Sequence, residues 1–136
     1  MTVTGSCLCG AIRFTYHGEI GFAAICHCSD CRKCTGSAFN VSIGVEVALL
    51  SLSGNSLKNF TKKADSGHNI TRHFCANCGS PIFTSSSVHP DRYYVKAGVF
   101  DDPDVVKPAY QSWLRSKVSW AEIPPCLPAH EKKRTP

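Results

Sequence analysis

The chain has 136 residues, of which 43% are hydrophobic and 18% are charged, enough apolar material for one folded domain and too little charge for intrinsic disorder. Its apolar runs fall short of the roughly 20 residues that a membrane helix needs, and the N-terminal sequence MTVTGSCLCG has neither the basic start nor the apolar stretch of a secretory leader. We therefore expect a cytoplasmic protein rather than a membrane protein, a secreted precursor, a coiled coil or a collagen-like fibre.

Short strands separated by glycine, proline or polar turns are the main predicted elements. Residues 11–16 alternate apolar Ile12, Phe14 and Tyr16 with polar side chains, the period-two pattern of a half-buried strand. Residues 29–35 and 104–107 are each expected to form a helical turn. Many short strands with frequent turns predict a mainly β, antiparallel fold with little helix. Further strands are expected at residues 22–25, 38–43, 45–52, 69–74, 81–85 and 92–97.

No linker or internal repeat divides the chain, which predicts a single domain over residues 1–128. Residues 129–136 are polar and basic, and we expect them to form a loose C-terminal tail.

The chain contains nine cysteines, an unusually high number for its length. Without a secretory leader, such a density indicates metal or redox chemistry rather than a disulfide framework. If seven thiolates bound two divalent ions, the formal net charge of +5 would fall to about +2. Because the basic runs at 58–63 and 132–134 contain Phe60 as their one aromatic, we expect a solvated surface and no nucleic-acid partner.

Four of the cysteines form two tight pairs, Cys7 with Cys9 and Cys75 with Cys78, and both pairs are bounded by glycine. Two pairs that each offer two thiolates from one turn can make a tetrahedral zinc site with every position filled. An ion held there would join the first predicted strand to a late one. The alternatives are buried thiols without a metal, or a disulfide.

A second group, Cys26, Cys28 and Cys31, offers three thiolates from one short segment. Three protein ligands leave a fourth position for water or substrate, as in catalytic zinc sites. Cys34 keeps another interpretation open, since it could complete a second closed structural site. An iron–sulfur cluster or a set of redox-reactive thiols is the third possibility. Cys126, which stands among prolines, is expected to be a bystander thiol.

Three ordered motifs carry a family resemblance that extends over nearly the whole chain. They are GSCLCGAIRF at residues 5–14, CHCSDCRK with TGSAF at residues 26–39, and RHFCANCGSPIF at residues 72–83. Together with GVFDDP at residues 98–103 and SKVSW at residues 116–120, they resemble the glutathione-dependent formaldehyde-activating enzyme family, which also contains the centromere protein V domain.

This resemblance implies an Mss4-like fold, built from several coiled antiparallel sheets around zinc. It also implies a structural zinc on Cys7, Cys9, Cys75 and Cys78, and a second zinc on Cys26, Cys28 and Cys31 with a thiol substrate near its open position. The implied activity is that of a carbon–sulfur lyase resembling S-(hydroxymethyl)glutathione synthase, which reversibly joins glutathione and a small aldehyde. A cysteine at position 34 departs from the family pattern and puts the open position in question.

Residues that follow the second cysteine group are candidates for binding the substrate. Arg32 could attract a carboxylate-bearing substrate such as glutathione, and Gly36 and Ser37 could bring backbone amides close to it. His27 stands between two expected ligands and should point away from the metal. The alternative to an enzyme is a non-catalytic zinc-stabilised module that binds a protein partner.

Overall fold

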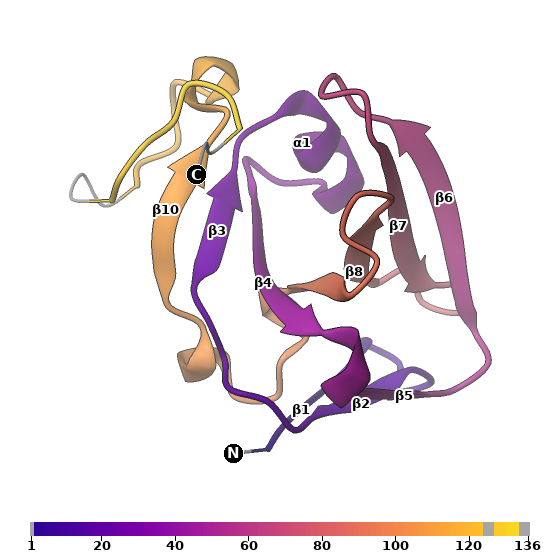
Figure 1. Cartoon of the computed structure of the whole chain (residues 1–136). Coiled ribbons are helices and arrows are strands. Elements are labelled where there is room, and N and C mark those ends of the chain that lie inside the picture. The colour runs from indigo at the N-terminus through magenta and orange to yellow at the C-terminus, as the bar shows by residue number, and fades with distance from the viewer. Residues whose placement is uncertain (1, 124–126, 134–136) are drawn as a thin grey trace.

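The computed structural model describes residues 2–123 and 127–133. These residues form ten strands, one α-helix and four short 3₁₀ helices, so the prediction of a mainly β fold with little helix is confirmed. The strands belong to two sheets. In Figure 1 the larger sheet bends around the α-helix, and the smaller sheet lies below it.

The smaller sheet has three antiparallel strands in the order β1-β2-β5. The central strand is the segment that alternates apolar and polar residues, and Phe14 and Tyr16 face the core from it. Phe14 contacts Phe100 edge-to-face, with ring centroids 5.3 Å apart. The three strands are β1 (Val3–Ser6), β2 (Arg13–Tyr16) and β5 (Leu50–Ser53).

The larger sheet has seven strands in the order β10-β3-β4-β9-β8-β7-β6. All of its neighbouring strands are antiparallel except β10 and β3, which run parallel and thereby differ from the all-antiparallel expectation. This sheet contributes Ile43, Val45, Phe83 and Val95 to the core. Its strands are β3 (Ala23–Cys26), β4 (Asn40–Glu46), β6 (Leu57–Lys63), β7 (Asn69–Cys75), β8 (Pro81–Ser86), β9 (Arg92–Lys96) and β10 (Pro108–Ser112).

The α-helix, α1 (Ser29–Thr35), has the bounds that the sequence predicted. It begins at Cys28, whose sulfur accepts a hydrogen bond from the amide of Cys31, and it ends at Gly36 with a φ of 66°, where glycine avoids the cost of a left-handed backbone. The 3₁₀ helices are η1 (Val47–Leu49), η2 (Ala97–Val99), η3 (Pro103–Val105) and η4 (Leu114–Ser116).

Three strands were not predicted from the sequence, namely β1, β6 and β10. The side chains of β6 are all exposed, and its sequence LKNFTKK has no apolar alternation because it is the edge strand of the large sheet. The strand expected at 45–52 is interrupted by η1, which turns the chain from the large sheet into the small one.

The end of the described chain lies along β10. The amide of Gln111 donates to the carbonyl of Pro128 at 2.9 Å, and the amide of His130 donates to the carbonyl of Gln111 at 2.9 Å. The amide of Trp113 donates to the carbonyl of Lys132 at 2.9 Å. The described part of the predicted tail is therefore attached to the large sheet. Cys126 lies outside the described residues, and no helix within them is both long and apolar enough to span a membrane.

Candidate metal centre

Cys7, Cys9, Cys75 and Cys78 come together as one group, the four-cysteine cluster, in which all sulfurs lie within 4.8 Å of one another. The first pair lies in the turn after β1, and the second pair lies at the end of β7 and in the turn that follows. The two turns have related backbones, since Gly10 and Gly79 both have a φ of 79°. At this angle a residue with a side chain would be strained, so glycine lets each turn close on its sulfurs.

The sulfur separations in the four-cysteine cluster fit a bound zinc ion. The sulfurs of Cys7 and Cys9 are 3.6 Å apart, and those of Cys9 and Cys75 are 3.9 Å apart. A tetrahedral ion with bonds of about 2.3 Å to sulfur separates its ligands by about 3.8 Å. A disulfide would bring two sulfurs to about 2.05 Å, and the cysteines of this cluster are all free.

Polar groups around the four-cysteine cluster favour the thiolate form of two of its members, Cys75 and Cys78. The hydroxyl of Ser80 lies 3.2 Å from the sulfur of Cys78 and lowers the pKa of Cys78 to about 5. The hydroxyl of Ser56 lies 3.3 Å from the sulfur of Cys75 and lowers the pKa of Cys75 in the same way. Hydrogen bonds of this kind orient metal ligands and stabilise their charge.

Cys26, Cys28 and Cys31 form a separate group, the three-cysteine cluster, whose sulfurs also lie within 4.8 Å of one another. Cys26 is the last residue of β3, Cys28 caps α1, and Cys31 lies in the first turn of that helix. The passage from strand to helix within a few residues turns all three sulfurs toward one point. The sequence predicted this grouping from spacing alone.

In the three-cysteine cluster without a metal, the sulfurs shift one another's pKa values in opposite directions. Hydrogen bonds from the Cys28 and Cys31 thiols lower the pKa of Cys26 to about 3. The interaction with Cys26 raises the pKa of both Cys28 and Cys31. A thiophilic cation at this point would replace the two remaining protons, as metal binding to cysteine requires.

Cys34 does not belong to either cluster. It lies near the end of α1, and its sulfur is 3.6 Å from the carbonyl oxygen of Cys31. The geometry therefore favours three thiol ligands rather than a fourth thiol that closes the site.

We expect the Cys34→Ala variant to retain about two zinc ions per chain, because its thiol is not among the converging sulfurs. Mass spectrometry of the purified, metal-loaded protein, with the wild-type chain as reference, measures the zinc content. A variant that holds one ion would show that Cys34 is a ligand.

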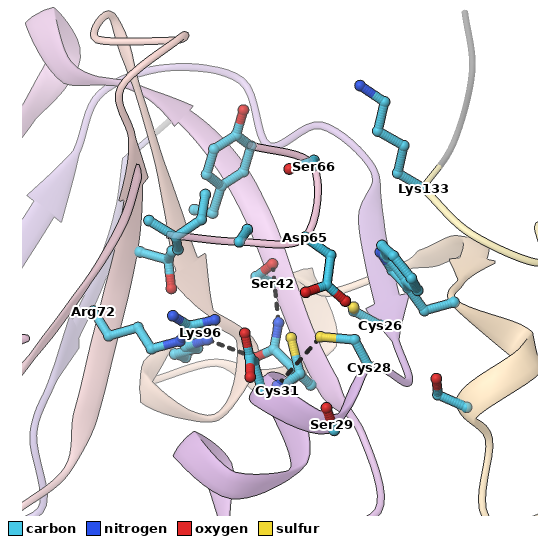
Figure 2. Close-up of a pocket in the computed structure, with 18 residues that line it drawn as sticks. Cys26, Cys28, Ser29, Cys31, Ser42, Asp65, Ser66, Arg72, Lys96 and Lys133 are labelled. Atoms are coloured by element: carbon cyan, nitrogen blue, oxygen red, sulfur yellow. Dashed lines mark hydrogen bonds between the residues drawn. The ribbon is translucent and has the colours of Figure 1, made fainter. Parts of the chain in front are cut away.

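The three-cysteine cluster lies in the wall of a pocket of about 260 Å³. Figure 2 shows Asp65 reaching over the cysteines from the turn between β6 and β7, and Arg72 and Lys96 entering from strands of the large sheet. A pocket that combines converging polar groups with apolar walls is the usual form of a small-molecule site. Its remaining lining residues are Ser29, Asp30, Asn40, Ser42, Ala64, Ser66, Ile70, Thr84, Tyr94, Trp113, Ser116 and Lys133.

Sequence reasoning did not single out Arg72, Lys96 or Asn40, which line this pocket. Lys96 follows the apolar Val95 at the end of β9, and nothing in its neighbourhood along the chain marks it as buried. Lys96 pairs with Ser42 of the adjacent strand β4, and this register places the Lys96 side chain beside Asn40. Strand register, rather than a local motif, brings these side chains to the cysteines.

The predicted substrate-binding residues lie elsewhere. The guanidinium of Arg32 donates to the carbonyls of His27 at 2.9 Å and Ser116 at 2.6 Å, and so holds the start of α1 against the chain after β10. Gly36 caps the end of α1, and the hydroxyl of Ser37 donates to the carbonyl of Phe39. None of Arg32, Gly36 and Ser37 is among the described residues that line the pocket.

His27 points into the protein rather than toward the cysteines on either side of it. Its side chain is 0% exposed, and its Nε2 atom lies 2.9 Å from Oε1 of Gln111. The imidazole also contacts the ring of Phe39 edge-to-face. This packing connects the junction between β3 and α1 to β10, and so holds in place the backbone that carries the three-cysteine cluster.

Comparison with known proteins agrees with this arrangement. Residues 2–116 match the family model described as glutathione-dependent formaldehyde-activating enzyme. A curated "Putative glutathione-dependent formaldehyde-activating enzyme" from Halomonas elongata is 27% identical over 129 residues, which cover 90% of this chain and 82% of that protein. A crystal structure of a Rhodobacter sphaeroides protein superposes with a TM-score of 0.57 at 20% identity, covering 72% of this chain and 87% of that one, a likeness of fold. The chain belongs to the glutathione-dependent formaldehyde-activating enzyme family.

Proposed function

We propose that this protein is a zinc-dependent enzyme of the carbon–sulfur lyase type, which adds a thiol such as glutathione to a small aldehyde or catalyses the reverse reaction. The observation that carries the proposal is a cluster of three cysteine sulfurs in a pocket wall, with the neighbouring Cys34 outside it. Family membership supports the same chemistry.

The two clusters would have different tasks. The four-cysteine cluster would hold a structural zinc, because its four sulfurs fill a tetrahedral site. The three-cysteine cluster would hold a second zinc with one position left for a ligand from the pocket. Zinc bound there would keep an entering thiol deprotonated at neutral pH.

The pocket then brings the thiolate and the aldehyde together. The sulfur adds to the carbonyl carbon, a carbon–sulfur bond forms, and the electron pair of the carbonyl π bond moves to the oxygen, which takes a proton from water to give a hydroxyalkyl thioether. Holding both reactants in one pocket of about 260 Å³ lowers the entropic cost of this two-molecule step. The side chains that line the pocket would then lie beside the oxygen as it becomes charged.

The cytoplasm is the location that we propose, because that compartment keeps thiols reduced. Eight cysteines in the described part of the chain are free, as thiol ligands of a metal must be. Glutathione and a small aldehyde are the proposed partners.

Exchange NMR with ¹³C-labelled formaldehyde and glutathione tests the proposed activity. The metal-loaded protein is expected to raise the rate at which the labelled carbon moves between its free and thiol-bound forms, in proportion to protein concentration. A control with the chelator-treated protein should show the rate of the protein-free solution. A metal-loaded protein with that same background rate would support the non-catalytic binding module instead.

A further inference from the structure

Two cationic side chains meet at the three-cysteine cluster. Lys96, the last residue of β9, is only 7% exposed. Arg72, which lies on β7 of the same sheet, is half-buried. Both line the same pocket as Cys31, and Figure 2 shows them entering it from the side on which Cys31 lies. The Nζ atom of Lys96 donates to Oδ1 of Asn40 at 2.8 Å, which holds the ammonium in place.

Within residues 2–123 and 127–133, neither Lys96 nor Arg72 forms an ion pair with a carboxylate. The ion pair found in the described part of the chain joins the ammonium of Lys62 to the carboxylate of Asp30, at 2.7 Å. Burial lowers the pKa of Lys96; the charge of Arg72 acts in the same direction, and the sulfurs of Cys34, Cys31 and Cys26 act in the opposite direction. Two like charges in a partly buried pocket, with a neutral amide as the hydrogen-bond partner, are costly unless an anion accompanies them.

The three-cysteine cluster alone supplies part of that anionic charge. Three thiolates and one divalent ion have a net charge of −1, whereas Lys96 and Arg72 together have a charge of +2. One positive charge is therefore left for an anion that arrives with, or forms on, the substrate. Three further charged residues line the pocket: Asp65 and Lys133 are exposed and have opposite charges, and the carboxylate of Asp30 is paired with the ammonium of Lys62 at 2.7 Å.

We propose that Lys96, held by Asn40 and assisted by Arg72, binds the oxygen anion that forms when a thiolate adds to the aldehyde. This inference rests on the proposed function. As the carbon–sulfur bond forms and the carbonyl electron pair moves to oxygen, the negative charge shifts from sulfur to an oxygen atom beside Lys96. Donors that are already oriented toward such a charge stabilise it without reorganisation. The anion then takes its proton from water, and both cations remain charged.

The Lys96→Met variant tests this role, because methionine keeps the length of the side chain and removes its charge. We expect kcat for formaldehyde and glutathione to fall about 100-fold, with little change in the KM for glutathione. Lys58→Met is the matched control, since Lys58 is exposed on β6 and does not line the pocket. An unchanged kcat with a raised KM for glutathione would overturn the proposal and make Lys96 an anchor for a substrate carboxylate.

A binding experiment tests the same charge pair without turnover. Calorimetry compares mercaptoacetate, which has an anionic oxygen near its sulfur, with the neutral mercaptoacetamide, in the zinc-loaded wild type and in Lys96→Met. The preference for mercaptoacetate, as the ratio of the two Kd values, is expected to fall about 10-fold in the variant. An equal ratio in the two proteins would overturn the proposal.

The two experiments separate the two proposals. A wild-type protein without exchange activity but with a Lys96-dependent preference for mercaptoacetate would contradict the proposed reaction and support the anion site. If Lys96→Met does not fold, Arg72→Met at the half-buried position is expected to lower the same preference. An Arg72→Met variant with the wild-type preference would then count against the anion site.

Discussion

Cys75→Ser is expected to remove one zinc ion and to unfold most of the protein. Cys75 is 0% exposed, and the four-cysteine cluster connects the turn after β1 to the turn after β7. A structural zinc site contributes about 10 kcal/mol or more to folding, which is comparable with the total stability of about 5–15 kcal/mol of an ordinary domain. Far-UV circular dichroism during heating, together with zinc analysis, measures both effects.

Cys34→Ala is the matched control for this experiment, because it also removes a thiol but lies outside both clusters. It should melt as a cooperative unit close to the wild-type temperature. A Cys75→Ser protein that melts at the wild-type temperature would contradict the assignment of a structural metal to the four-cysteine cluster.

Cys31→Ser is expected to remove the other zinc ion, abolish exchange between formaldehyde and glutathione, and leave the fold intact. Cys31 lies in the first turn of a seven-residue helix, and α1 contributes no residue to the described core. Loss of one of three thiolates weakens the site severely, because two remaining protein ligands hold zinc poorly. Zinc content, circular dichroism and exchange NMR on one preparation give the three readouts.

Lys33→Ala provides the control in the same helix, since Lys33 is exposed and does not line the pocket. It is expected to keep both metal ions and the wild-type exchange rate. If Cys31→Ser retained its zinc and its activity, Cys31 would not be a ligand and the proposed reaction centre would be wrong. Unfolding of Cys75→Ser together with an intact fold of Cys31→Ser would distinguish a structural metal site from a catalytic one.

Local spacing was sufficient to predict the group of Cys26, Cys28 and Cys31 and the two tight pairs of the four-cysteine cluster, whereas the fold brings those two pairs together. Ligands one to three residues apart must lie close together whatever the rest of the chain does, so Cys26, Cys28 and Cys31 could be assigned to one group. The tight pair at Cys7 and Cys9 follows the same rule. The bounds of α1 and most of the strands were also visible, because alternation and turn residues act over a few positions.

Which residues line the pocket depends on contacts between segments that are far apart in the sequence. Lys96 reaches the cysteines because β9 pairs with β4 in one register, and a shift by one residue would turn its side chain to the other face. Arg32, which follows the cysteines directly in the sequence, instead donates to the backbone of His27 and Ser116. The roles of Arg32, Gly36 and Ser37 in binding a substrate therefore stay predictions from the sequence, which the lining of this pocket does not support.

The cysteine pattern and the alternating strands were thus encoded locally, and they predict a metal-binding β protein before any coordinates are known. Whether Cys34 joins its neighbours, and which charged side chains surround the sulfurs of the three-cysteine cluster, depended on the folded chain. The reason is physical, since metal ligands within a turn are positioned by a few backbone angles, whereas a buried lysine is positioned by strand register and by the packing of two sheets.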